Sequence, residues 1–232
     1  LPILQSRPFS GAQNGKLAVS ASRPGTCIWV TGDKDRKPFR TSDFGASWQE
    51  IQSLPNNLVR GGTWPKSFPV DNDKVNGEVF YVLDNRERSE YAARFYLSED
   101  GGQNFKHTYT FPVSTDSKFA VRAAPGSEGE VWVGMEYAGL FRSLDYGRTF
   151  TRISGFAYVY SFGLGIGYGD IPMVYAYGRR GGRSGVYRSD DRGNTWVYIS
   201  SETTNCGRNP FVIEGDRRIP GRAYVGTGGR SV

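Results

Sequence analysis

The octapeptide Ser143-Leu144-Asp145-Tyr146-Gly147-Arg148-Thr149-Phe150 has three close counterparts in the chain, at residues 41–48, 98–105 and 189–196. All four segments follow the pattern Ser/Thr-x-Asp-x-Gly-x-x-aromatic. Ordinary residue frequencies give one match a chance of about 1 in 10,000 per starting position, so four matches are an internal repeat. The repeated positions are Asp43, Gly45 and Trp48, then Asp100, Gly102 and Phe105, then Asp145, Gly147 and Phe150, and finally Asp191, Gly193 and Trp196.

The spacing of this repeat predicts the fold class. Successive aspartates are 57, 45 and 46 residues apart, and such a period is typical of propeller blades with four strands each. Runs of β-branched and aromatic residues, bounded by Gly and Pro, lie at residues 16–20, 27–30, 78–83, 130–133, 173–177, 211–213 and 222–226. No segment sustains a helical period. We therefore predict an all-β propeller with four blades that contain the repeat and the opening strands of a fifth.

The sequence allows two ways of closing the propeller ring. Five blades lie near the low end of the usual range for propellers, and the predicted fifth blade stops within its second or third strand. Either residues upstream of Leu1 complete a larger ring, such as one of seven blades, or residues 1–12 supply a closing strand. Residues 1–232 are accordingly predicted to be one propeller domain or a portion of one.

The residue types of the repeat suit a tight turn between two strands. The Asp side chain accepts hydrogen bonds from the backbone N–H groups that follow it, and Gly supplies a positive φ. The closing aromatic residue begins the next strand and buries apolar surface between blades. A calcium loop would need oxygen ligands at alternating positions and a Glu at the twelfth, which none of the four segments supplies. We expect a structural role, with no metal and no cofactor.

Charge, hydropathy and histidine content argue against several other function classes. The net charge is +6, but the densest basic group, Arg179, Arg180 and Arg183, is interrupted by glycines and no nucleic-acid motif accompanies it. No apolar run is long enough for a membrane helix, and residues 1–4 are too short and uncharged for a signal peptide. The single histidine, His107, is predicted to be a surface strand residue and not a metal ligand or catalytic base.

Three further side chains are candidates with open alternatives. Cys27 and Cys206 fall in different predicted blades, and they either form a disulfide in an oxidising compartment or are two unrelated buried thiols. Trp64 lies in the Gly- and Pro-rich loop Gly61-Gly62-Thr63-Trp64-Pro65, where it either stacks on a sugar ring or fills a junction between blades. The other four tryptophans are expected in the core.

The repeated turn resembles the Asp box of sialidases and related propeller proteins, and we use that term for the four segments. Residues 123–132, 139–143, 185–191 and 215–227 resemble the C-terminal propeller of glycoside hydrolase family 74, and the likeness extends more loosely over nearly the whole chain. That resemblance implies secreted xyloglucanases and related endoglucanases built from two seven-bladed propellers across an open cleft. It also implies hydrolysis of β-1,4-glucan with inversion by two aspartates, one from each propeller.

The resemblance leads to a functional hypothesis with one rival. Asp100-Gly101-Gly102 matches part of the family's acid motif but lies inside an Asp box, so no catalytic residue is assigned to this chain. Residues 200–206 also depart from the acidic, His-containing stretch usual in the family. We predict one wall of the polysaccharide cleft in a secreted, inverting glycoside hydrolase, with the catalytic aspartates outside this chain and an N-terminal propeller as partner. The alternative is a non-catalytic glycan-binding propeller or an extracellular scaffold that assembles with other protein chains.

Overall fold

A computed structural model describes residues 15–32, 36–56, 58, 67–85, 92–115, 118–200 and 210–227. Every helix or strand assigned within these ranges is a β-strand, so the prediction of an all-β fold is confirmed. No helix in this part of the chain has the length and hydropathy needed to cross a membrane.

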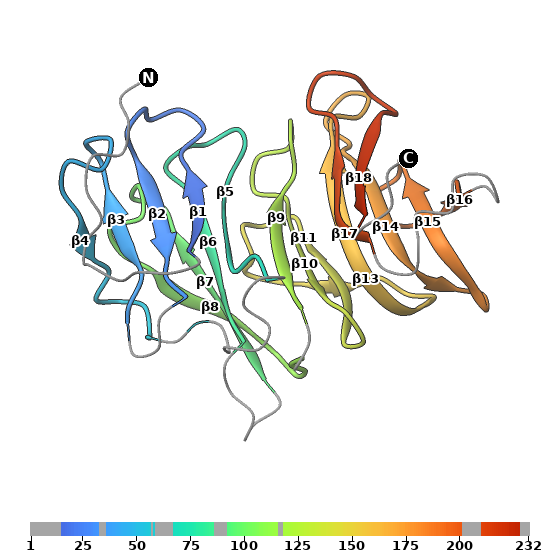
Figure 1. The fold of residues 1–232 in the computed structure, drawn as a ribbon, viewed down its shortest axis with the longest axis horizontal. Helices are drawn as coiled ribbons and strands as arrows, with labels where there is room; N and C mark the ends of the chain where they lie inside the picture. Colours follow the sequence, from blue (N-terminus) through green and yellow to red (C-terminus); the bar gives the residue numbers. More distant parts are fainter. Residues whose placement is uncertain are drawn as a thin grey trace.

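The strands form four four-stranded sheets and one two-stranded sheet (Figure 1). Their bounds are β1 Lys16–Val19, β2 Cys27–Val30, β3 Phe39–Thr41, β4 Gln49–Glu50, β5 Val70–Asn72, β6 Phe80–Asp84, β7 Ala93–Ser98, β8 Lys106–Phe111, β9 Ala120–Ala123, β10 Val131–Met135, β11 Gly139–Ser143, β12 Thr151–Arg152, β13 Phe156–Gly165, β14 Met173–Arg180, β15 Arg183–Ser189, β16 Val197–Tyr198, β17 Pro210–Gly215 and β18 Ala223–Thr227.

Each four-stranded sheet is an antiparallel meander in which consecutive strands pair, as expected for a propeller blade. The first strands, β1, β5, β9, β13 and β17, contact one another in that order and form the inner edge of the array. In Figure 1 the first and last sheets lie apart, so the described strands form an arc. Residues 1–12, the predicted source of a closing strand, lie outside the described residues.

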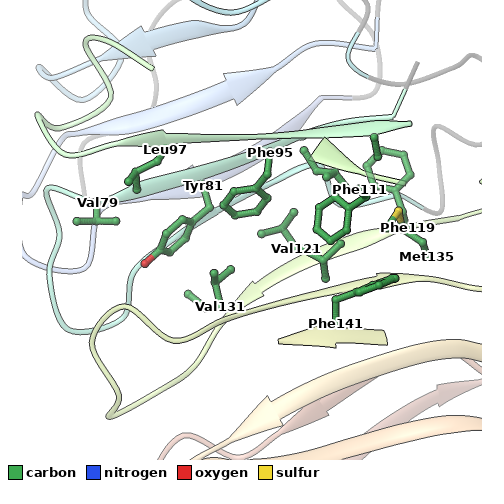
Figure 2. Close-up of a cluster of buried hydrophobic side chains, with 14 residues drawn as sticks. Val79, Tyr81, Phe95, Leu97, Phe111, Phe119, Val121, Val131, Met135 and Phe141 are labelled. Atoms are coloured by element: carbon green, nitrogen blue, oxygen red, sulfur yellow. The ribbon is translucent and has the colours of Figure 1, made fainter. Parts of the chain in front are cut away.

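The apolar core lies between neighbouring sheets. Figure 2 shows the cluster between the second and third blades, where Tyr81 and Phe95 face Val121 and Phe141. The ring of Phe111 is fully buried there and lies 5.1 Å from the ring of Phe141. Equivalent clusters fill the other three seams. Alternate strand residues point to opposite faces of a sheet, so each blade contributes to the seams on both sides.

The meander gives the molecule two different faces. Turns between the first and second strands and between the third and fourth strands emerge on one side, upward in Figure 1, and we call it the box face because it carries the four Asp boxes. Turns between the second and third strands, and the connections between sheets, emerge on the opposite side. We call that side the loop face.

Candidate functional site

The Asp boxes are closed by hydrogen bonds within the turn. At the third box, Asp145 Oδ1 accepts from the backbone N–H groups of Arg148 at 3.1 Å and Thr149 at 2.9 Å. Ser143 Oγ donates to the same carboxylate at 2.7 Å and accepts from Gly147 N at 2.8 Å. The other boxes repeat this network around Asp43, Asp100 and Asp191.

Each box contains two successive residues in the left-handed region. Gly147 has a φ of 79°, and Tyr146 before it has a φ of 62°. The same pair of conformations occurs in the other boxes, with Phe44, Gly101 and Arg192 at the first position. The sequence pattern indicates the glycine but gives no signal for the residue that precedes it.

The hydrogen bonds also set the ionisation of the box aspartates. Donation from the hydroxyl and backbone N–H of Ser47 lowers the pKa of Asp43 to about 2. At Asp145, partial burial opposes ionisation, but the hydrogen bonds from Thr149 and Ser143 outweigh it and lower the pKa. Carboxylates that are ionised and already bonded within a turn fit a structural role better than proton transfer.

The boxes also join each blade to the one before it. A Cβ placed on Gly102, Gly147 or Gly193 would lie 2.4 Å from Ile28, 2.1 Å from Phe95 or 3.1 Å from Trp132, all in the preceding blade. The glycine is therefore needed for close packing as well as for its φ.

The loop face carries an aromatic pair that spans two blades. Tyr137, at the tip of the β10–β11 hairpin, is 67% exposed, and its ring centroid lies 5.6 Å from that of half-buried Tyr158 on β13. The backbone N–H of Val159 donates to the carbonyl of Glu136 at 3.1 Å, which ties the hairpin tip to β13. The Tyr158 hydroxyl is 3.2 Å from Ser184 Oγ. Tyr137 is thus open to solvent, and the Val159–Glu136 and Tyr158–Ser184 contacts fix the position of the pair.

A pocket lined mostly by apolar and aromatic side chains, with a few charged ones, lies beside this pair at the inner edge of the array. Its lining includes Lys118, Arg122, Glu136 and Tyr160. The ammonium of Lys118 lies 3.3 Å from the ring centroid of Tyr160. Burial, with a smaller contribution from the Glu136 charge, raises the pKa of the Tyr160 hydroxyl. Tyr160 lies at an irregularity in the pairing of β13 with β14, and such bulges redirect side chains near functional surfaces.

Only some of the predicted site residues lie in the part of the chain that the structure describes. Trp64 and Cys206 lie outside the described residues, so the sugar-stacking and disulfide alternatives stay predictions. Cys27 is buried, and burial raises the pKa of its thiol to about 11. His107 is an exposed residue of β8 that contacts Thr110 Oγ1 at 2.9 Å, as predicted for a surface strand.

The other four tryptophans differ in burial. Trp132 is fully buried, whereas Trp29, Trp48 and Trp196 are only partly buried, so the core prediction is right for one and too strong for three. Within the described ranges, no group of three or more His, Cys, Asp or Glu side chains is placed to hold a metal ion.

The tyrosines of the loop face were not predicted. Tyr158 and Tyr160 belong to the run Phe156-Ala157-Tyr158-Val159-Tyr160, which alternates aromatic and small or aliphatic residues. That alternation is a signal for a strand with one aromatic side. The pairing with Tyr137, in another blade, has no counterpart in the local sequence.

Comparison with known proteins finds relatives among the xyloglucanases. No family model matches the chain. A xyloglucanase of Acetivibrio thermocellus is 34% identical over 220 residues, which cover 94% of this chain and 24% of that protein. The chain thus spans about a quarter of the length of the curated relatives that it matches.

Solved structures give the same result. The GH74 xyloglucanase from Xanthomonas campestris superposes with a TM-score of 0.79 at 29% identity, over 99% of this chain and 30% of that one. A GH74 enzyme from Niastella koreensis superposes with a TM-score of 0.76 at 26% identity, over 94% of this chain and 30% of that one. The resemblance is therefore confirmed, and over nearly all of its length this chain is related to a propeller segment of the glycoside hydrolase family 74 xyloglucanases.

Proposed function

We propose that this chain forms one wall of the glycan cleft in a secreted, inverting hydrolase that acts on xyloglucan or another β-1,4-glucan. The observation that carries the proposal is the open Tyr137–Tyr158 pair on the loop face. The relation to xyloglucanases supports the choice of polysaccharide. A polymeric substrate of this kind favours an extracellular location.

The geometry of the pair suits a sugar ring. Aromatic side chains offer an apolar face for the C–H groups of a pyranose and a hydroxyl for its polar rim. Tyr137 is exposed. The contacts of Tyr158 and Glu136 hold the Tyr137–Tyr158 pair in one arrangement. Binding to a surface already in place costs less ordering of side chains and loops.

The catalytic pair is proposed to lie outside this chain. Inversion needs an acid and a base about 6.5–9.5 Å apart with room for a water molecule. The box aspartates are held by hydrogen bonds within their turns and lie on the face opposite Tyr137. An N-terminal propeller facing the loop face would supply the opposite wall of the cleft.

The test is calorimetric titration of the 232-residue chain with xyloglucan oligosaccharides. Tyr137→Ala is expected to weaken binding about tenfold, the equivalent of 1.4 kcal/mol of lost stacking. Tyr168→Ala is the matched control, because Tyr168 is 74% exposed and lies in the β13–β14 turn on the box face. Equal affinities for the wild-type and Tyr137→Ala chains would contradict the proposed wall.

A second measurement separates the hydrolase from the non-catalytic alternative. Release of reducing ends from xyloglucan by the complete polypeptide that contains this chain is the expected result. Oligosaccharide binding that depends on Tyr137 but is accompanied by no hydrolysis would favour a glycan-binding propeller instead.

A further inference from the structure

The β14–β15 hairpin presents the densest basic group of the sequence on the loop face. Arg179 and Arg180 end β14, Arg183 begins β15, and Gly181 and Gly182 form the turn between them. The two glycines have φ values of 56° and 80°, as in the type I′ turn that matches the twist of paired strands. A Cβ on either glycine would meet no atom within 4 Å, so the tip of the hairpin is open to a ligand.

The register of the hairpin brings like charges together. Arg180 lies directly opposite Arg183, and like charges in that position destabilise a strand pair. The Arg180 guanidinium lies 5.4 Å from the ring centroid of Phe156, and its Nη1 donates to the Ser154 carbonyl at 2.6 Å. The Arg183 guanidinium lies 3.7 Å from the ring centroid of Tyr198. These contacts orient the two guanidinium groups but do not neutralise their charge.

The positive charge of the hairpin is not balanced by an acidic side chain. Within the described ranges, none of its three arginines forms an ion pair with a carboxylate. On the box face, by contrast, Arg148 pairs with Glu99 and Arg222 pairs with Asp216, each at 2.7 Å. The hairpin therefore offers an anion a concentrated and uncompensated positive charge.

The hairpin belongs to the same surface as the Tyr137–Tyr158 pair. Arg179 lies directly opposite Tyr158 on one side and Ser184 on the other. The Tyr158 hydroxyl, 3.2 Å from Ser184 Oγ, connects the two flanking strands. A sugar chain that stacks on the tyrosines can therefore reach the arginines without leaving this surface.

We propose that the β14–β15 hairpin binds the carboxylates of an acidic polysaccharide, one whose chain contains uronic acid residues. The choice of a glycan rests on the proposed function, and the negative charge of the ligand goes beyond it. Arginine presents a planar fork of N–H donors that fits a carboxylate with two parallel hydrogen bonds. A uronic acid ring offers such a carboxylate together with the C–H face that suits a tyrosine.

The size of the basic group favours this ligand over nucleic acid. Binding to a phosphate backbone uses many cationic contacts along an extended track, with several aromatic side chains for the bases of a single strand. Three arginines at the tip of one hairpin cover a short stretch of a chain. That extent fits a few carboxylates next to a neutral segment held by the tyrosines.

The test is calorimetric titration of the 232-residue chain with galacturonic acid oligomers, their methyl esters and neutral xyloglucan oligosaccharides. The double variant Arg179→Gln/Arg183→Gln is expected to bind the acid oligomers about tenfold more weakly or worse, because it loses two charge-assisted contacts. Its affinity for the neutral oligosaccharides should be unchanged. Arg180 is retained because its guanidinium also bonds to the Ser154 carbonyl.

A matched control removes the same charge from the opposite face. Arg217 and Arg218 are exposed in the β17–β18 turn on the box face. Arg217→Gln/Arg218→Gln should bind the acid oligomers nearly as tightly as the wild-type chain does. The thermal midpoints of both double variants should stay within about 2 °C of the wild-type value, which separates lost binding from lost folding.

Three outcomes would overturn the proposal: equal affinity of the wild-type chain for the acid oligomers and their methyl esters, an equal loss in both double variants, or tighter binding of a single-stranded oligonucleotide than of the acid oligomers. Its failure is distinguishable from that of the proposed function. Arginine-dependent binding of the acid oligomers without binding of xyloglucan would support the acidic ligand and contradict the xyloglucan cleft. Binding of xyloglucan with no preference for the acid would do the reverse.

Discussion

The box face and the loop face lie at opposite ends of the same strands, yet they are built in different ways. On the box face, four turns repeat one hydrogen-bond network, and the box glycines pack against the preceding blade. On the loop face, within the part of the chain that the structure describes, the Tyr137–Tyr158 pair and the Lys118–Tyr160 contact each occur once. The repeated parts carry the contacts that hold blades together, and the unrepeated parts are free to differ in chemistry.

The largest difference between the faces is expected at two glycines with the same backbone conformation. Gly147 has a φ of 79° in the third box and Gly182 has a φ of 80° on the loop face. Gly182→Ala should cost about 1–2 kcal/mol, because only the left-handed backbone is penalised. Gly147→Ala should cost about 3 kcal/mol or more, since the new Cβ would also overlap Phe95, which is buried. Urea denaturation of both variants measures the difference. Equal losses of unfolding free energy would show that the boxes do not connect neighbouring blades.

A smaller loss is expected when the box network itself is broken. Asp145→Ala removes the acceptor for Arg148 N, Thr149 N and the Thr149 hydroxyl, so we expect a loss of about 2 kcal/mol. Asp145→Asn keeps one oxygen of similar shape and should lose about half as much. Urea denaturation again provides the measurement, and an unchanged midpoint for Asp145→Ala would contradict the structural role of this carboxylate.

The boxes also predict an acid-sensitive stability. A folded-state pKa below the unfolded value stabilises the protein above the unfolded pKa, and this contribution is lost as pH falls through the folded pKa. For Asp43 that window runs from about pH 4 down to about pH 2, and the other box aspartates act in the same direction. Burial raises the pKa of Glu214, which acts in the opposite sense. Thermal midpoints between pH 5 and pH 2 should fall steadily, and Asp43→Asn should make the fall shallower.

The smallest effect on stability is expected from a substitution in the Tyr137–Tyr158 pair. Tyr137→Ala removes an exposed side chain and leaves the Val159–Glu136 backbone contact in place, so its cost should stay within about 0.5 kcal/mol. A thermal melt of this variant tests the contrast with Gly147→Ala. A large loss would mean that the loop face also holds the blades together.

The sequence predicts the scaffold well because its signals are local. Cys27–Val30 was predicted with the observed bounds, since Gly25 and the β-branched run mark a strand without tertiary information. The strand predicted at residues 78–83 begins later, at Phe80, because Asn76 and Asp73 hold residues 75–79 in a turn. Such shifts at strand ends depend on side-chain hydrogen bonds that periodicity does not report.

The candidate site was harder to predict because it is assembled across blades. Tyr137 and Tyr158 are separated by two strands, β11 and β12, by the third Asp box and by a connection between sheets, and the sequence around neither residue indicates that they meet. The predicted sugar-stacking residue, Trp64, was chosen from loop composition alone, and its role stays a prediction. Residues that act through long-range contacts leave little trace in one sequence.

Because the core lies between sheets, the burial of each blade's apolar side chains depends on the neighbouring blades. Phe80 and Val82 are fully buried only because the first blade covers them, and Val174 and Ala176 depend in the same way on the third. Stability in such an array is a sum over adjacent pairs. The smallest cooperative unit is therefore two consecutive blades, and an opening at one seam loosens the blades on both sides.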